Sequence, residues 1–311
     1  MPTQLKFAMK NKDPKIHGIL LVNKPQNIVS FKVTKTLEKL LGAKTGHAGT
    51  LDPFADGLMI IGVNKATRLL EYFSNFDKEY LVTAKWNSET DTLDPDGIVT
   101  KSCTNSVNVD EISECIKKDF TGIITQIPPI YSAIKHQGTP MYKLARAGSN
   151  IIPKSRQTTI FEINNLNNDQ VNNTSSFQVL CSKGTYIRSL VRDIAYKLNN
   201  LAHATALTRT KIANFKLEDA VDFAKISPDN LTEILQSKSF ISLEDLRVNN
   251  NVVTLNATEY LAFSQGKRIA RNDLHFTETD VINTVFQGKL IGISRISKDL
   301  EKAISPIKVF I

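Results

Sequence analysis

The sequence has no long apolar run. Its longest ones, residues 18–22 and 57–63, are much shorter than the roughly 20 residues that a membrane-spanning helix needs. The first residues, MPTQLKFAMKNK, are basic but have neither a sustained apolar region nor a small-residue cleavage site, so we expect no signal peptide. We therefore expect a cytoplasmic protein without a membrane span.

Cysteine and histidine are also scarce. The three cysteines, Cys103, Cys115 and Cys181, are far apart and odd in number, which favours reduced thiols over a disulfide framework. The five histidines form no i, i+3 or i, i+4 pair and stand beside no cysteine cluster, so we expect no metal site.

Two short segments imitate ligand-binding loops without meeting their requirements. Residues 92–97, TLDPDG, would put Thr92 and Cys103 at the first and twelfth positions of a calcium loop, where acidic ligands are needed. Residues 42–46, GAKTG, lack the glycine that a phosphate-binding loop has four residues before its Gly-Lys-Ser/Thr triplet. We therefore expect neither bound calcium nor a nucleotide cofactor.

The composition is that of an ordered globular protein. The 311 residues are 41% hydrophobic and 23% charged, with only 14 glycines and 11 prolines, which leaves room for one large or two modest domains. Apolar spacing predicts helices from Ser30 to Gly42, from Asp110 to Phe120 and over 185–198, with Arg188 and Arg192 on a second face of the last. It predicts strands over 17–22, 80–86, 158–163, 176–182, 281–286, 290–296 and 307–311.

These elements do not alternate as strand and helix, so we expect an α+β fold with a mixed, largely antiparallel sheet rather than a βαβ array. Residues 43–58 have no period and contain four Gly or Pro residues, which predicts a loop long enough to carry function. The Asn-rich stretch 164–174 predicts an exposed hairpin end. The triplet Asn249-Asn250-Asn251 marks a domain boundary, with 1–248 before it and a small β-rich domain, 249–311, after it.

Positive charge is concentrated in three segments. Residues 1–50 have a net charge of +7, residues 135–160 of +5 and residues 183–216 of +6; these sum to +18, so the rest of the chain has −10 if the total is +8. Such segregation suits a face that binds a polyanion. Solvated lysine faces would give the same pattern, and charge alone does not separate the two interpretations.

The loop at 46–53, GHAGTLDP, contains the best candidate for a reactive group. Asp52 could be a nucleophile or general base, and the neighbouring glycines would let a ligand approach closely. An Asp-Pro pair also simply initiates turns, and a lone loop histidine such as His47 is often structural. The residue types alone leave these alternatives open.

Several motifs resemble the bacterial tRNA pseudouridine-55 synthase family, known as TruB. Residues 44–58, KTGHAGTLDPFADGL, look like its signature, and the resemblance continues in PPIYSAIK at 128–135, YKLARAG at 142–148, CSKGTYIRSL at 181–190, AH at 202–203, LTR at 207–209 and FKLED at 215–219. Residues 288–294, GKLIGIS, are similar to part of the family's small RNA-binding domain, which is of the PUA type. The resemblance implies the pseudouridine synthase fold for 1–248 and a PUA-like domain for 249–311.

The resemblance implies isomerisation of a T-loop uridine, at tRNA position 55, by a monomer that uses no cofactor. It makes Asp52 the nucleophile, Arg188 its ionic partner and Tyr80 the aromatic group that stacks on the uracil. The same resemblance implies base flipping, which costs a few kcal/mol. The residues expected to bind the substrate are His47, Tyr186, Leu207, Lys24 and Arg209.

Two departures concern supporting loops. Asn23 and Asn27 stand where the family usually has aspartate and glycine, and Asn199, Asn200 and Leu201 replace glycines after the long helix. Two alternative functions remain: a tRNA-binding or tRNA-folding protein without catalysis, and a pseudouridine synthase that acts on another RNA.

Overall fold

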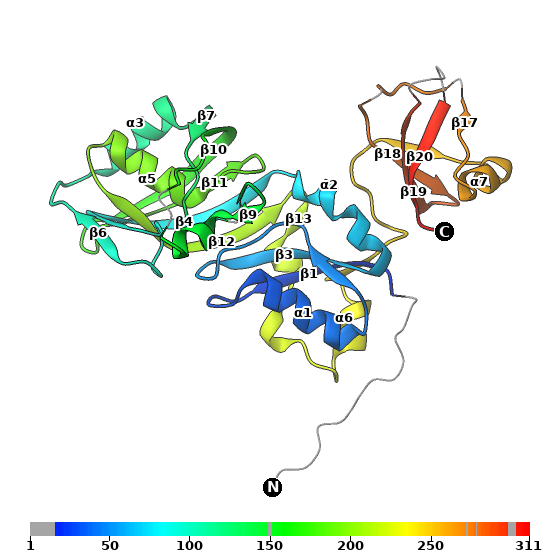
Figure 1. Ribbon diagram of the computed structural model, residues 1–311, viewed down its shortest axis with the longest axis horizontal. Helices are drawn as coiled ribbons and strands as arrows, with labels where there is room; N and C mark the ends of the chain where they lie inside the picture. Colours follow the sequence, from blue (N-terminus) through cyan, green and yellow to red (C-terminus); the bar gives the residue numbers. More distant parts are fainter. Residues whose placement is uncertain (1–15, 133, 149–150, 272, 278, 298–302) are drawn as a thin grey trace, which may run out of the picture.

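The computed structural model describes residues 16–132, 134–148, 151–271, 273–277, 279–297 and 303–311. Among these residues the larger of two main sheets has 11 strands and forms the long body in Figure 1. Eight strands lie side by side in the order β14 (Val221–Asp222), β1 (Gly18–Lys24), β3 (Asp56–Val63), β12 (Ala202–Ile212), β4 (Lys78–Trp86), β11 (Thr174–Cys181), β10 (Arg156–Asp169) and β7 (Gly122–Gln126). Three more are attached at the sides: β2 (Thr45–His47) on β3, β13 (Phe215–Lys216) on β12 and β15 (Phe240–Ser242) on β1.

The second sheet lies in the C-terminal part of the chain and has the order β16 (Val252–Thr254), β18 (Ile282–Phe286), β19 (Lys289–Ile296), β20 (Ala303–Val309) and β17 (Ile269–Ala270). Two small ribbons pair β5 (Ser88–Thr90) with β6 (Val99–Ser102), and β8 (Lys135–His136) with β9 (Thr139–Pro140). The α-helices are α1 (Ser30–Leu41), α2 (Leu70–Ser74), α3 (Val109–Asp119), α4 (Met141–Arg146), α5 (Ile187–Lys197), α6 (Leu231–Gln236) and α7 (Ala257–Ser264). Short 3₁₀ turns are η1 (Asn64–Leu69), η2 (Leu217–Asp219) and η3 (Phe223–Lys225).

Two groups of helices cover different parts of the larger sheet (Figure 1). Helices α3 and α5 pack their apolar stripes on β4, β10, β11 and β12, where Val82, Phe177 and Leu190 are fully buried or nearly so. Helices α1 and α6 pack on β1 and β3 through residues such as Leu37. The sheet therefore has two helix-covered halves, and β3 and β12, which pair in parallel, join them.

The C-terminal sheet packs directly against the larger sheet through apolar side chains. Val285, Leu290 and Phe310 share one apolar cluster with residues of β1, β3 and α2. The side chain of Asn283 is fully buried, and its amide donates to the Asn249 carbonyl at 2.9 Å and to the Asn251 carbonyl at 2.9 Å. The asparagine triplet is thus bonded to the second sheet.

The structure confirms the α+β class and the main predicted elements, with several corrections. Residues 43–58 are not wholly a loop, because β2 pairs with β3 from Thr45 to His47 and β3 begins at Asp56. The hairpin end is shorter than 164–174, since β10 and β11 pair as far as Asp169 and Thr174. Strands β3 and β12, at the centre of the sheet, had no predicted counterpart.

Candidate active site

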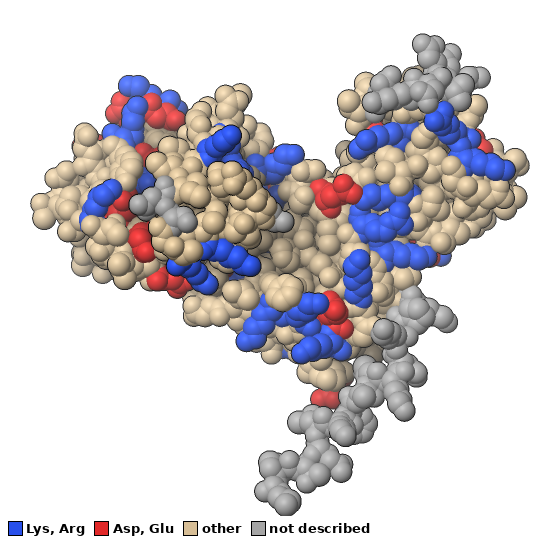
Figure 2. All heavy atoms as spheres, viewed as in Figure 1, with Lys and Arg blue, Asp and Glu red and all other residues tan. Residues whose placement is uncertain are grey.

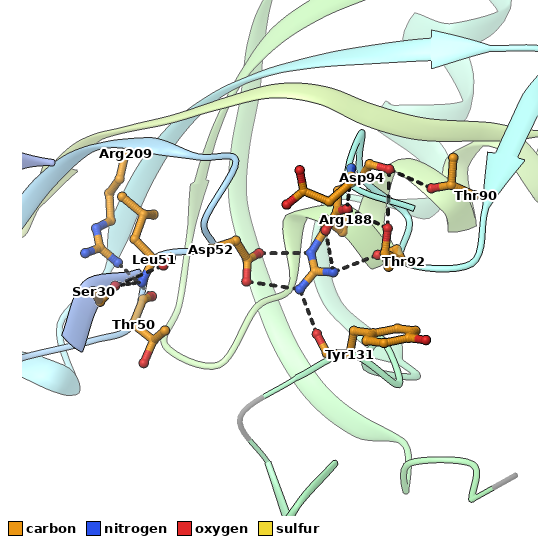
Figure 3. A network of polar contacts seen from close by, with 11 residues as sticks. Ser30, Thr50, Leu51, Asp52, Thr90, Thr92, Asp94, Tyr131, Arg188 and Arg209 are labelled. Atoms are coloured by element: carbon orange, nitrogen blue, oxygen red, sulfur yellow. Dashed lines mark hydrogen bonds and ion pairs between the residues drawn. The ribbon is translucent and has the colours of Figure 1, made fainter. Parts of the chain in front are cut away.

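Asp52 lies on the segment 48–55 that links β2 to β3. Hydrogen bonds from the first residue of α1 and from the residues just before this helix fix the segment. The Ser30 hydroxyl donates to the Leu51 carbonyl at 2.9 Å and accepts from the Leu51 amide at 2.9 Å (Figure 3). The N-cap of α1 is Val29, so the Ser30 hydroxyl does not cap the helix and binds the loop instead. On the other side of Asp52, the Asn27 amide donates to the Pro53 carbonyl at 2.7 Å.

Lys24 supports the same segment from inside the protein. Its side chain is fully buried, and its Nζ donates to the carbonyls of Pro25 and Ile28 at 2.9 Å each and of Pro53 at 3.3 Å. Burial lowers the pKa of Lys24 to about 8. Lys24 does not line the pocket described below, so the structure gives it a supporting position rather than one that faces a substrate.

The carboxylate of Asp52 meets the guanidinium of Arg188 in a two-point contact (Figure 3). Arg188 Nε lies 2.9 Å from Asp52 Oδ2, and Arg188 Nη2 lies 3.1 Å from Asp52 Oδ1. The Arg188 side chain is only 3% exposed, whereas that of Asp52 is 32% exposed. A buried cation thus holds a carboxylate that still reaches solvent, a geometry that fixes the plane of the carboxylate.

Three more acceptors hold the far side of Arg188. Its Nη1 donates to the Thr92 carbonyl at 2.6 Å and to Asp94 Oδ2 at 2.9 Å, and its Nη2 donates to the Tyr131 carbonyl at 3.0 Å. Burial raises the pKa of the Asp94 carboxyl, although the Thr92 hydroxyl and then Arg188 act against this. Arg188 does not share an exposed face with Arg192; it is an interior residue with two acidic partners.

A pocket of about 290 Å³ opens beside Asp52, close to the lower end of the volumes usual for small-ligand sites. Six of the eight residues singled out from the sequence line it: Asp52, Tyr80, Tyr186, Arg188, Leu207 and Arg209. A larger hollow of about 580 Å³ lies by α7, but its Arg271 already contacts Glu259 and Asp273. The chemistry therefore points to the smaller pocket.

Neighbouring strands supply the aromatic wall of the pocket and its support. Tyr80 of β4 pairs in register with Arg209 of β12, and burial raises the pKa of the Tyr80 phenol. Arg209 is 1% exposed and donates through Nε to the Leu58 carbonyl at 2.7 Å. Its Nη groups reach the carbonyls of Gly49 and Thr50 at 3.3 and 3.4 Å. Arg209 therefore lines the pocket and also supports the loop that carries Asp52.

Tyr186 lies immediately before α5 and is held by a buried amide. The Tyr186 amide donates to Gln126 Oε1 at 3.1 Å, and Gln126 Nε2 donates back to the Tyr186 carbonyl at 3.3 Å. Burial raises the pKa of the Tyr186 phenol. The position of this ring in the wall of the pocket is thus set by β7, the strand at the edge of the sheet.

His47 lies on β2, outside the lining of the pocket. The Gly49 amide donates to His47 Nδ1 at 3.3 Å, an arrangement that requires this nitrogen to be an acceptor and assigns the proton of the neutral ring to Nε2. Burial, followed by the charge of Arg209, lowers the pKa of His47. At neutral pH the ring is therefore an uncharged donor through Nε2.

Sequence reasoning missed three residues of this site. Asp94 belongs to the turn that imitates a calcium loop, and its function in the structure is to bind Arg188. Lys78 and Ser132 also line the pocket. Burial lowers the pKa of Lys78 to about 8, and the Ser132 hydroxyl is buried beside the Tyr186 phenol. The signal available in the sequence was that residues 91–96 form an acidic turn that does not fit a metal-binding pattern, so its carboxylates needed another partner.

Across the described part of the chain, no group of three or more His, Cys, Asp or Glu side chains is placed to hold a metal ion. In the same residues no helix is long and apolar enough to cross a membrane.

The chain is similar to known proteins over most of its length. The family described as "TruB family pseudouridylate synthase (N terminal domain)" matches residues 35–187. A tRNA pseudouridine synthase B from Borreliella burgdorferi is 39% identical over 240 residues, which cover 77% of this chain and 84% of that protein. The protein of the same name from Syntrophomonas wolfei is 34% identical over 303 residues, covering 95% and 99%.

Solved structures give the same fold. The chain is similar to one in the crystal structure of a Cbf5-Nop10-Gar1 complex, with a TM-score of 0.71 and 23% identity. The match covers 94% of this chain and 85% of that one. It shows that the mixed sheet and the C-terminal sheet belong to one known architecture.

Proposed function

The chain belongs to the TruB family of pseudouridylate synthases, and on that premise we propose that it isomerises uridine in tRNA to pseudouridine. The observation that supports this most directly is the Asp52–Arg188 pair, which presents one carboxylate to a pocket lined by Tyr80 and Tyr186. The relatives named tRNA pseudouridine synthase B support tRNA as the substrate. The finer proposal is that the target is the T-loop uridine at position 55.

The reaction is an isomerisation, so no group is lost overall. The bond from uracil N1 to ribose C1′ breaks, a bond from C5 to C1′ forms, the C5 proton leaves and N1 gains a proton. We assign the nucleophilic role to Asp52, whose orientation Arg188 fixes. Tyr80 stacks on the base, and Leu207 and Tyr186 enclose it.

A uridine inside a folded loop must leave its stack to reach this pocket. We assign to His47, whose Nε2 carries the proton, a contact with the displaced nucleotide, since its Nδ1 accepts from the Gly49 amide in the loop of Asp52. Lys24 and Arg209, expected from the sequence to bind substrate, act in this proposal mainly by supporting that loop, since their donors are directed to backbone carbonyls.

We further propose that residues 1–248 form the catalytic domain and that residues 249–311 are a PUA-like RNA-binding domain. Lys and Arg side chains gather over α1 and beside the C-terminal sheet (Figure 2). These basic side chains would bind the phosphates of a folded RNA, whose shape rather than a long sequence would be recognised. The protein would act as a monomer on the T-stem-loop, in the cytoplasm where its substrate is found.

The test is release of the C5 proton from unmodified tRNA transcript labelled at C5 of uridine, with chelator and no added cofactor. We expect about one proton per tRNA, mapped to the T-loop. Asp52→Asn should abolish release while tRNA binding stays close to that of the wild type and thermal unfolding still shows a folded protein.

The other outcomes separate the alternatives. Tight binding without release by the wild type would favour a non-catalytic tRNA-binding protein. Equal turnover of a T-stem-loop and an unrelated uridine hairpin would favour a synthase for another RNA. Release by Asp52→Asn at the wild-type rate would remove Asp52 as the nucleophile.

A further inference from the structure

Arg156 lies beside the active-site pocket, behind two residues that line it, Gly184 and Tyr186, and no described acidic side chain pairs with it. It is the first residue of β10 and is partly exposed. Its guanidinium carbon is 5.6 Å from the centre of the Tyr186 ring, which lines the pocket. Among the described residues its side chain makes no ion pair or hydrogen bond, whereas the side chains of Arg188, Arg209 and Arg192 all donate to carboxylates or carbonyls.

The strand register explains why Arg156 is held there. Arg156 of β10 is directly opposite Gln126 of β7 in an antiparallel pair, and opposite residues of such a pair project from the same face of a sheet. Gln126 binds the backbone of Tyr186 through two hydrogen bonds, and Arg156 covers its ring. One register position therefore fixes both the main chain and the side chain of Tyr186.

The backbone next to Arg156 leaves its guanidinium accessible. Gly184 also lines the pocket and has a φ of +80°, a left-handed conformation that favours glycine. Arg156 Nη1 would be 3.6 Å from a Cβ at Gly184, so the guanidinium lies directly against this bare stretch of backbone. A planar group with five donors thus lies over an aromatic ring that lines the pocket, and no described residue accepts from these donors.

Phosphate is the ligand that this arrangement suits. Guanidinium groups bind phosphate through paired hydrogen bonds, and most protein–nucleic acid hydrogen bonds go to the backbone rather than the bases. A uracil inside the pocket carries its ribose and two flanking phosphates at the entrance. We propose that Arg156 is a substrate-binding residue that holds a phosphate flanking the target uridine against the pocket wall formed by Gly184 and Tyr186.

This inference rests on the proposed function and assigns a role to a residue outside the Asp52–Arg188 pair. Binding the phosphate at this point favours the flipped nucleotide over the stacked one, because the contact exists only once the base has entered. The contact to Tyr186 keeps the guanidinium in place before the RNA arrives, which lowers the ordering cost of binding.

The experiment combines a protein change with a change in the RNA. Stem-loop substrates carry a single neutral methylphosphonate at the linkage 5′ or 3′ of the target uridine, and kcat/KM is measured for the wild type and for Arg156→Gln. We expect Arg156→Gln to lower kcat/KM on the unmodified RNA by ~10- to 100-fold, the range for one hydrogen bond to a charged group. One of the two methylphosphonates should lower wild-type kcat/KM similarly but have almost no further effect on Arg156→Gln.

Two variants sharpen the result. Lys154→Gln removes the same charge from an exposed position two residues away, so it should keep the full methylphosphonate effect. Arg156→Lys keeps the charge without the paired donors, and it should recover only part of the loss.

The outcomes are distinct from those that test the proposed function. If the wild type does not isomerise the unmodified stem-loop or tRNA, the proposed function fails. If it does, but the effects of Arg156→Gln and of both methylphosphonates simply multiply, Arg156 only supports Tyr186 and our inference is wrong.

Discussion

Replacing Asp94 by asparagine tests whether the buried side of the Arg188 network sets the rate of the reaction. Asp94 Oδ2 accepts from Arg188 Nη1 at 2.9 Å, and Oδ1 accepts from the Thr92 hydroxyl at 2.5 Å and from the Asp96 amide at 3.1 Å. Asparagine has one oxygen and one NH₂ group in these places. Whichever way it turns, it directs a donor at another donor.

The size of the effect follows from these contacts. Losing one hydrogen bond to a charged group costs about 1.5–3 kcal/mol of stability, and part of this is offset because burial of a carboxylate, which raises the pKa of Asp94, is relieved. For the reaction the consequence is positional, since Arg188 loses one of the acceptors that hold it and can shift, and Asp52 shifts with it. Misplacement by about 1 Å can cost ~100-fold, so we expect kcat to fall by ~10- to 100-fold, or about 1.4–2.7 kcal/mol.

The assay is the single-turnover rate of C5-proton release at saturating enzyme, with tRNA affinity measured in parallel. Affinity should change by less than about twofold, because Asp94 itself does not line the pocket and reaches it only through Arg188. Asp96→Asn is the matched control, since it removes the same charge at an exposed position and keeps the amide that binds Asp94. A folded Asp94→Asn protein with wild-type kcat would refute the reasoning.

Three further predictions concern the support of the site. Ser30→Ala removes both hydrogen bonds to the loop that carries Asp52. We expect denaturant unfolding to show a free energy of unfolding ~2–4 kcal/mol lower, and kcat to fall while tRNA affinity is retained. An unchanged free energy of unfolding would contradict this. Gly57→Ala puts a Cβ 2.4 Å from the Arg209 carbonyl oxygen and should lower the free energy of unfolding by more than about 3 kcal/mol. Gly122 also has a positive φ but has open space around it, so Gly122→Ala should lower the free energy of unfolding by only about 1 kcal/mol. Equal losses in the two variants would refute the steric argument. Burial lowers the pKa of His47 below its ordinary 6.5. As the pH falls, the unfolded chain therefore binds more protons than the folded protein, and the stability contributed by the neutral ring is lost. The excess stability of the wild type over His47→Gln in thermal unfolding should shrink between about pH 7 and about pH 5, and a constant difference would contradict this.

The local spacing of apolar residues was sufficient to predict a helix or strand where only one face of that element is buried. Alternation at Tyr80 and Val82 predicted β4, and a continuous apolar stripe predicted α5. The pattern gave no register, so it could not show that Arg209 pairs with Tyr80 or that Gln126 is opposite Arg156. Strand β3 is buried along nearly its whole length and therefore shows no alternation.

The charged residues show a related limit. Net charge over a segment counts Lys24, Arg188 and Arg209 with exposed lysines, although all three are buried among carbonyl or carboxylate oxygens. Burial of a cation depends on acceptors that come from distant parts of the chain. Arg188 meets Asp94 across 94 residues and the Tyr131 carbonyl across 57, separations that no local pattern contains.

This arrangement explains how one carboxylate can be singled out in a network with two. Arg188 contacts Asp52 and Asp94 at the same distance of 2.9 Å, but Asp94 is 7% exposed and Asp52 is 32% exposed. Asp94 also accepts from the Thr92 hydroxyl and the Asp96 amide, so both of its oxygens are occupied. Of the acceptors around Arg188, Asp52 alone belongs to the lining of the pocket. The buried acid therefore fixes the cation, and the cation in turn fixes the one carboxylate that a nucleotide can reach.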